Sequence, residues 1–220
     1  MRCYRLYVAA LSVCALSLAL SCARAQSPAP DRVAILPWVF ELGTSGAQAS
    51  AKGFLSAVLL KARLEELPQA RTTLMWEDGM GKKHDAKRAT LPKSAELLKL
   101  GQKLDVDWVI AGRAKWHTRS LWVGMGPKTK SDCTVDMLIV DVRKQVVALD
   151  AKAVKMDSTA KENTLKAVGA IVLTPLFTVV SGGPKTPHEQ RAVQLAIAKA
   201  IQPWLATRVE SAHKIDADDK

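Results

Sequence analysis

The chain is poor in cysteine and in aromatic residues. Three of its four cysteines fall within the first 25 residues, so Cys133 is the only one in the remainder. If those 25 residues are removed on export, an intramolecular disulfide is excluded, although an exported protein meets conditions that permit one. Aromatic residues make up 5% of the sequence. They do not alternate with basic residues as base stacking requires, so we expect no nucleic-acid partner.

Motifs for catalysis are also missing. The four histidines lie far apart and lack metal-ligand spacing with one another or with Cys133. The tetrapeptide GPKT occurs twice, but proline stands where a phosphate loop needs glycine before its lysine. No G-x-S-x-G nucleophile motif is found. We therefore expect no enzymatic activity, no metal and no cofactor.

The amino terminus has the three parts of a secretory signal. Arg2 and Arg5 precede an apolar stretch from Leu6 to Leu20, and small residues follow. This pattern predicts a signal peptide over residues 1–25 and a proline-bearing linker over 26–31. Two alternatives stay open, namely a lipoprotein signal cleaved before Cys22, which would be lipidated, and an uncleaved membrane anchor.

Acidic residues are outnumbered. Without the signal segment, 29 basic residues face 21 acidic ones, which leaves a net charge of +8. Such an excess favours an anionic lipid or polymer surface as a partner, and an ordinary basic, solvated surface is the simpler alternative.

Periodicity predicts secondary structure for most of the chain. In its first half we expect a buried strand over Arg32–Phe40, an amphipathic helix over Ala47–Leu67, a short strand over Arg71–Trp76 and a polar loop over 77–93. A helix over Ser94–Leu104, with Ser94 as N-cap, follows this loop.

The second half is expected to contain three strands and a final helix. A strand begins at Trp108, and strands over 133–142 and 145–156 form a hairpin that turns at Arg143 and Lys144. A helix begins near Pro187, and residues 210–220 have too little apolar surface to fold.

A basic row on the first of these strands is the best candidate site. Alternation places Arg113, Lys115, His117 and Arg119 on one face, opposite Ile110 and Trp116. Such a row suits an anionic ligand or a partner, and Lys82 and Lys83 in the polar loop would reinforce it. The alternative is cross-strand pairing with Asp132 and Asp136 on the next strand.

The run Ala167–Pro184 has no charged side chain. It predicts an extra apolar helix before the final one, with a bulky stripe that contains Val168, Val172, Leu176 and Phe177. Burial in the core, docking on a partner or membrane surface, and spanning a membrane stay open for this helix.

Three segments bear a resemblance to a known group. The apolar strand at 31–40 that contains Pro37, the helix and strand at 100–116 with Asp107, and the hairpin at 135–154 with Asp141 resemble the CsgG class and the TolB amino-terminal class of bacterial envelope proteins. Lys144 and Gln145 stand where those families place Thr-Gly.

The resemblance implies an α/β fold, with helices packed on a mixed sheet in the order β-α-β-α-β-β-β-α, as one domain over 32–209. It also implies a non-enzymatic module that binds or assembles envelope proteins, is periplasmic or secreted, and has an envelope protein or a second copy as partner. Two other functions stay open: an enzyme that acts on an anionic envelope polymer through its basic face, and a membrane-anchored subunit or outer-membrane lipoprotein.

Overall fold

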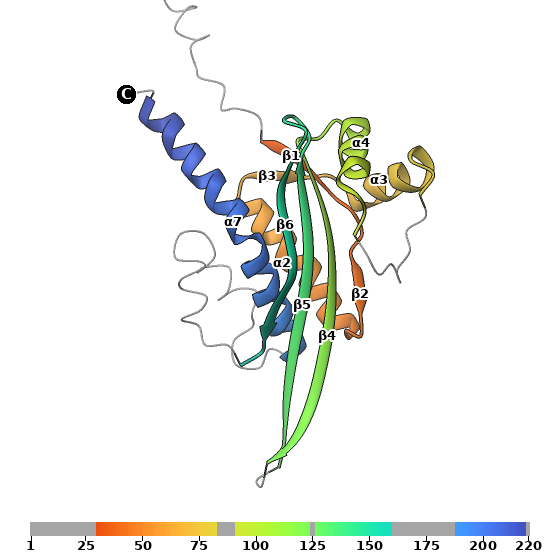
Figure 1. Cartoon of the computed structure of the whole chain (residues 1–220), viewed down its shortest axis with the longest axis vertical. Helices are drawn as coiled ribbons and strands as arrows, with labels where there is room; N and C mark the ends of the chain where they lie inside the picture. Colours follow the sequence, from red (N-terminus) through yellow and green to blue (C-terminus); the bar gives the residue numbers. More distant parts are fainter. Residues whose placement is uncertain (1–29, 83–90, 124–125, 160–187, 219–220) are drawn as a thin grey trace, which may run out of the picture. The chain divides into compact units, whose positions relative to one another are not determined.

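A mixed β-sheet forms the centre of the fold in the computed structural model (Figure 1), which describes residues 30–82, 91–123, 126–159 and 188–218. Its strands follow the order β3-β1-β4-β5-β6, and β2 also pairs with β4. β1 pairs in parallel with β3 and β4, whereas β4, β5 and β6 form an antiparallel meander. The strands are β1 (Asp31–Ile35), β2 (Val39–Glu41), β3 (Leu64–Glu66), β4 (Trp108–Val123), β5 (Gly126–Asp141) and β6 (Val146–Asp157).

Helices cover both faces of this sheet. α2 and α7 pack on one face, and α3, the π-helical turn η1 and α4 pack on the other (Figure 1). The predicted α/β class, with helices on a mixed sheet, is thereby confirmed. The helical elements are α2 (Ser45–Lys61), α3 (Gln69–Leu74), η1 (Met75–Gly79), α4 (Ser94–Leu104) and α7 (His188–Asp218).

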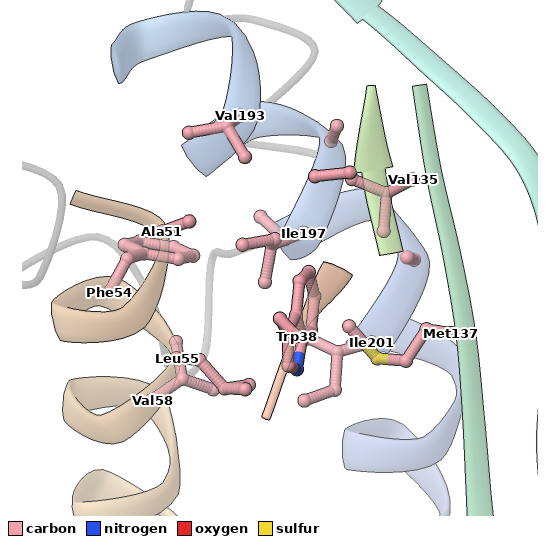
Figure 2. Close-up of a cluster of buried hydrophobic side chains, with 14 of the residues drawn as sticks. Trp38, Ala51, Phe54, Leu55, Val58, Val135, Met137, Val193, Ile197 and Ile201 are labelled. Carbon is pink, nitrogen blue, oxygen red and sulfur yellow. The ribbon is translucent and has the colours of Figure 1, made fainter. Parts of the chain in front are cut away.

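The larger core lies between the sheet, α2 and α7. Figure 2 shows Phe54 and Val58 of α2 facing Ile197 and Ile201 of α7, next to Met137 of β5. All five side chains are fully buried. Burying a side chain of this size contributes about 1.5–3 kcal/mol, so this layer carries much of the fold's stability.

A smaller core lies on the opposite face, under α4. Ala34 of β1 and Val109 of β4 belong to it, whereas their neighbours Val33 and Ile110 belong to the larger core. Strands that are apolar on both faces read as continuous apolar runs. The expected burial of the first strand on both faces is confirmed.

The predicted hairpin is found, with β5 and β6 joined by a turn over 142–145. Gln145 takes the left-handed conformation, φ 57°, that usually selects glycine. The backbone N–H of Lys144 donates to Asp141 Oδ1 at 2.9 Å. This hydrogen bond closes the turn although the Thr-Gly of the resembling families is missing.

Three predicted boundaries are wrong. Arg32–Phe40 is not one strand, because β1 stops at Ile35 and β2 starts at Val39, and Pro37 between them has no N–H to donate. The helix over Ala47–Leu67 stops at Lys61, because Arg63 is left-handed, φ 57°, and the chain then enters β3. The N-cap of α4 is Lys93, whose N–H donates to Glu96, so Ser94 is the first helical residue.

The short strand predicted over Arg71–Trp76 is also wrong, since this segment lies in α3 and η1. Thr72 and Trp76, four residues apart, are both buried. β3 occupies the outer position of the sheet beside β1. Side chains at this spacing share one helical face, and burial of that face overrides the β-propensity of threonine and tryptophan.

At the carboxyl end, α7 continues to Asp218, although an irregular tail was expected from residue 210. Its sequence beyond Pro203 contains neither glycine nor proline, so nothing breaks the helix. The apolar run Ala167–Pro184 lies outside the described residues. Within them, no helix is long and apolar enough to cross a membrane.

Candidate functional site

The basic row lies on one face of β4, as alternation predicts. Ala114 and Trp116 point into the larger core, whereas Lys115, His117 and Arg119 between and beyond them are exposed. α4 packs against the same sheet through Val109 and Ala111, nearer the start of β4. The row therefore continues the face that α4 covers.

Carboxylates neutralise the first two cations of the row. Arg113 Nε lies 3.4 Å from Glu41 of β2 and 3.6 Å from Asp136 of β5. Lys115 Nζ lies 3.5 Å from the other oxygen of Glu41. The register places Arg113 opposite Asp136 and His117 opposite Asp132. The cross-strand arrangement considered as an alternative is therefore present in the sheet.

The pairing extends across β5 to β6. Lys155 lies 2.7 Å from Asp132, and the pKa of Asp132 is lowered by this hydrogen bond and charge. Lys130 lies 3.0 Å from Asp157, and Thr159 donates to the same carboxylate. The Thr159 hydroxyl and then Lys130 lower the pKa of Asp157 to about 2.

We call this surface the ladder face. It has four carboxylates paired with four cations, so Arg113 and Lys115 of the basic row do not form an excess of positive charge. An anion that approaches Arg113 or Lys115 would compete with Glu41 and Asp136. A surface of alternating charge is instead suited to a protein surface with the complementary alternation. Its residues are Glu41, Arg113, Lys115, His117, Lys130, Asp132, Thr134, Asp136, Lys155 and Asp157.

The other predicted site residues are not brought to this face by any contact in the described residues. Lys82 lies where η1 meets α4, and its ammonium pairs with Glu96 at 2.9 Å. Lys83, the lipidation candidate Cys22, and the stripe of Val168, Val172, Leu176 and Phe177 lie outside the described residues.

A second polar cluster, which sequence reasoning did not predict, joins distant parts of the chain. Glu189, at the start of α7, accepts hydrogen bonds from the Thr44 hydroxyl at 2.7 Å and the Thr118 hydroxyl at 2.9 Å. Trp116 Nε1 donates to its carbonyl oxygen at 3.1 Å. Partial burial acts to raise the pKa of Glu189, but the hydrogen bonds from Thr44 and Thr118 outweigh it and lower the pKa. The cluster fixes α7 on α2 and β4.

A third cluster lies where β1 and β4 begin. Arg208 of α7 donates to Asp31 at 2.7 Å, and its guanidinium lies over the rings of Trp108 and Trp204. Arg143 pairs with Asp31 at 3.3 Å. Burial acts to raise the pKa of Asp31, but the hydrogen bonds from Arg208 and Trp108 lower it overall. This arrangement ties α7 to the sheet.

In the described part of the chain, no group of three or more His, Cys, Asp and Glu side chains is placed to hold a metal ion. Cys133 is fully buried, and this burial raises the pKa of its thiol to about 12. The thiolate is the reactive form of cysteine, and a raised pKa keeps the thiol protonated. Cys133 is therefore a packing residue of the core and not a nucleophile.

No protein-family model matches the chain, and no curated protein matches its sequence significantly. Among solved structures, it is similar to the lipoprotein GNA1162 from Neisseria meningitidis, with 15% identity and a TM-score of 0.42 over 68% of this chain and 99% of that one. It is also similar to the hypothetical protein CT253 from Chlamydia trachomatis, with 13% identity and a TM-score of 0.43 over 81% and 99%.

A third similar structure is the LpoB C-terminal domain from Escherichia coli, with 10% identity and a TM-score of 0.34 over 57% of this chain and 82% of that one. At such identities and TM-scores the likeness carries no conclusion about function. None of these three is described as a member of the CsgG or TolB class, so that resemblance remains a prediction.

Proposed function

We propose that the chain is an exported, non-enzymatic module of the bacterial cell envelope that binds a protein through its ladder face. The observation that carries this proposal is the pairing of Arg113 and Lys115 with Glu41 and Asp136. It makes the face polar and nearly neutral. Such a face favours association through complementary charges, which contribute specificity more than affinity.

The proposed location follows from the amino-terminal segment. Basic residues, an apolar stretch and small residues in that order are typical of a signal for export. The resemblance of the β1, β4 and β5–β6 segments to the CsgG and TolB classes supports the same location. Periplasmic and secreted forms both fit, as does an outer-membrane lipoprotein attached through Cys22.

The alternative of an enzyme that acts on an anionic polymer is less well supported. Such an enzyme needs cations available to the polymer, whereas Arg113 and Lys115 each contact a carboxylate. Replacing both with alanine distinguishes the two functions. It would abolish activity on the polymer under the alternative and would only weaken association under the proposal.

Crosslinking in the native host tests the proposal directly. A photoreactive amino acid is placed at Lys115, which is 53% exposed on the ladder face, and in a second strain at Lys61, which is exposed on α2. We expect a discrete adduct from position 115 and none from position 61. An adduct of twice the chain's mass would identify a second copy, and any other discrete mass a different protein.

The same experiment can reject the proposal. A third strain carries the photoreactive amino acid at Thr134, also on the ladder face. If neither position 115 nor position 134 gives an adduct, while the photoreactive chain is exported and folded, the ladder face is not a binding surface. Cys22→Ser, analysed in parallel by fractionation, tests lipidation separately. The lipoprotein alternative requires this variant to leave the membrane fraction.

A further inference from the structure

β4 and β5 extend beyond the rest of the sheet as a two-stranded ribbon. β2 pairs with β4 only as far as Lys115, and β6 pairs with β5 only from Asp132 onward. From Arg119 opposite Lys130 to Val123 opposite Gly126, the backbones of the two strands pair only with each other among the described residues. Figure 1 shows their outer ends extending past α2, α7 and the other strands. A two-stranded ribbon alone is marginally stable in water.

The ribbon is strongly basic. The sequence from Thr118 to Ser131 contains three Lys and Arg residues and no Asp or Glu. The carboxylates of the ladder face neutralise Arg113, Lys115 and Lys130, but the described residues show no salt bridge to the exposed Arg119. Positive charge thus remains toward the outer end.

Two cations also face each other across the ribbon, since Arg119 lies opposite Lys130 in the register. Like charges at directly opposite positions destabilise a strand pair. Lys128 follows two register steps further out, opposite Leu121. Asp157 of β6 pairs with Lys130 and offsets this repulsion in part, so Arg119 and Lys128 are the cations of the ribbon left for an anionic surface.

Apolar residues occupy the outermost register positions. Leu121, Trp122 and Val123 follow one another at the end of β4, opposite Lys128, Pro127 and Gly126. Tryptophan is enriched where a bilayer meets water, and juxtamembrane cations are attracted to anionic headgroups. Lys128 lies beside this apolar end and Arg119 lies inward of it, which is the order that such an interface requires.

We propose that the outer end of the β4–β5 ribbon docks on the surface of an anionic lipid bilayer. Leu121, Trp122 and Val123 enter the headgroup region, and Arg119 and Lys128 lie at the level of the lipid phosphates. This inference goes beyond the proposed function, because it concerns lipid and a different surface. It can hold or fail whatever the ladder face binds.

Vesicle binding tests the proposal. The chain from Gln26 onward, which contains the whole compact unit that begins at Asp31, is mixed with vesicles of phosphatidylcholine alone or of phosphatidylcholine with phosphatidylglycerol, and binding is measured by flotation. Each cation near an anionic surface adds about fivefold to binding, so the two cations Arg119 and Lys128 should give a preference for anionic vesicles of about 25-fold. Equal binding to both vesicles would overturn the proposal.

Two variants identify the part of the chain responsible. Leu121→Ser combined with Trp122→Ser should lower binding to anionic vesicles by tenfold or more, because apolar burial is lost. Arg119→Glu should weaken binding and reduce its salt dependence. Wild-type binding by both variants would place the lipid contact elsewhere in the chain and reject the proposal.

A fluorescent label gives a test that does not depend on how stable these variants are. Val123→Cys and the control Lys61→Cys are each labelled with an environment-sensitive dye, to which the fully buried Cys133 is inaccessible. We expect a blue shift on anionic vesicles at position 123 only. No shift there, or an equal shift at position 61, would contradict docking through the ribbon.

Discussion

The indole of Trp38 lies directly against the backbone of Gly112. A Cβ atom at Gly112 would be 2.1 Å from Cε2 of this ring. Trp38 follows Pro37 in the break between β1 and β2, and its ring belongs to the larger core. The break in the strand and the glycine on β4 therefore form one packing arrangement.

Gly112→Ala should destabilise the fold by about 1–3 kcal/mol, because a methyl group there overpacks the core against Trp38. Urea denaturation measures the loss. Gly53→Ala is the matched control, since a Cβ at this position in α2 would meet no side chain or other element within 4 Å. Replacing a helical glycine with alanine should instead stabilise by about 1 kcal/mol. Equal effects of the two changes would mean that the close contact has no cost.

Arg208→Ala should destabilise the fold by about 1.5–3 kcal/mol. It removes a charged hydrogen bond to Asp31, of which a quarter is exposed, and the contacts with two tryptophan rings. Arg32→Ala is the comparison, because its partner Asp105 is almost fully exposed and such pairs contribute about 0–1 kcal/mol. Thermal unfolding followed by circular dichroism ranks the two. Our interpretation of the Asp31 cluster fails if Arg32→Ala costs as much.

Stability should fall in acid because the folded state lowers the pKa of several carboxyls. The pKa of Asp157 is about 2 in the folded chain and 3.8 ordinarily, so its contribution is fully present above pH 4 and is lost as the pH falls toward 2. Asp31, Asp132 and Glu189 have pKa values lowered in the same direction. Melting temperatures between pH 5 and pH 2 should therefore decrease.

Thr159→Val provides the control for this pH dependence, since it removes the hydroxyl that donates to Asp157. The variant should be less stable at pH 5, and its melting temperature should fall less between pH 4 and pH 2. Superimposable curves for the variant and the wild type would show that Thr159 does not set the pKa of Asp157.

Cys133 should not react with a thiol reagent in the folded chain. Its side chain is fully buried, and the pKa of its thiol is raised to about 12, so almost no thiolate is present at pH 8. Ellman's reagent should detect one thiol per mature chain after denaturation in guanidinium and none before. Rapid labelling without denaturant would mean that β5 opens readily.

Local periodicity was enough to predict the antiparallel part of the sheet. Alternation along β4 separates the buried Trp116 from the exposed Lys115, and the β5–β6 turn follows from the polar residues between two apolar runs. The same reasoning failed at Thr72–Trp76, where the residue types favour a strand. The structure of this segment depends on tertiary contacts, because β3 already occupies the sheet position beside β1. A local sequence pattern carries no information about such contacts.

The partners of the candidate site were less predictable. Asp136 could be proposed as a partner of Arg113 because hairpin strands are adjacent in sequence. Glu41 comes from β2, far from β4 in the sequence, and its pairing with Arg113 depends on the parallel register. Thr186 and Glu189 have the sequence spacing of a local capping box, whereas the observed partner of Glu189, Thr44, is 145 residues away. Contacts over such distances follow from topology rather than from local pattern.

Glu189 should therefore couple the start of α7 to β4. Glu189→Ala removes the acceptor of the Thr44 and Thr118 hydroxyls and should cost about 1–3 kcal/mol in urea denaturation. Glu189→Gln keeps one carbonyl acceptor and should cost less. A double-mutant cycle with Thr118→Val isolates the contact and should give a coupling energy of at least about 0.5 kcal/mol. Strict additivity of the two changes would show that the hydrogen bond between Glu189 and Thr118 does not couple α7 to β4, because a carboxylate that stabilised α7 without this contact would not sense the Thr118 hydroxyl.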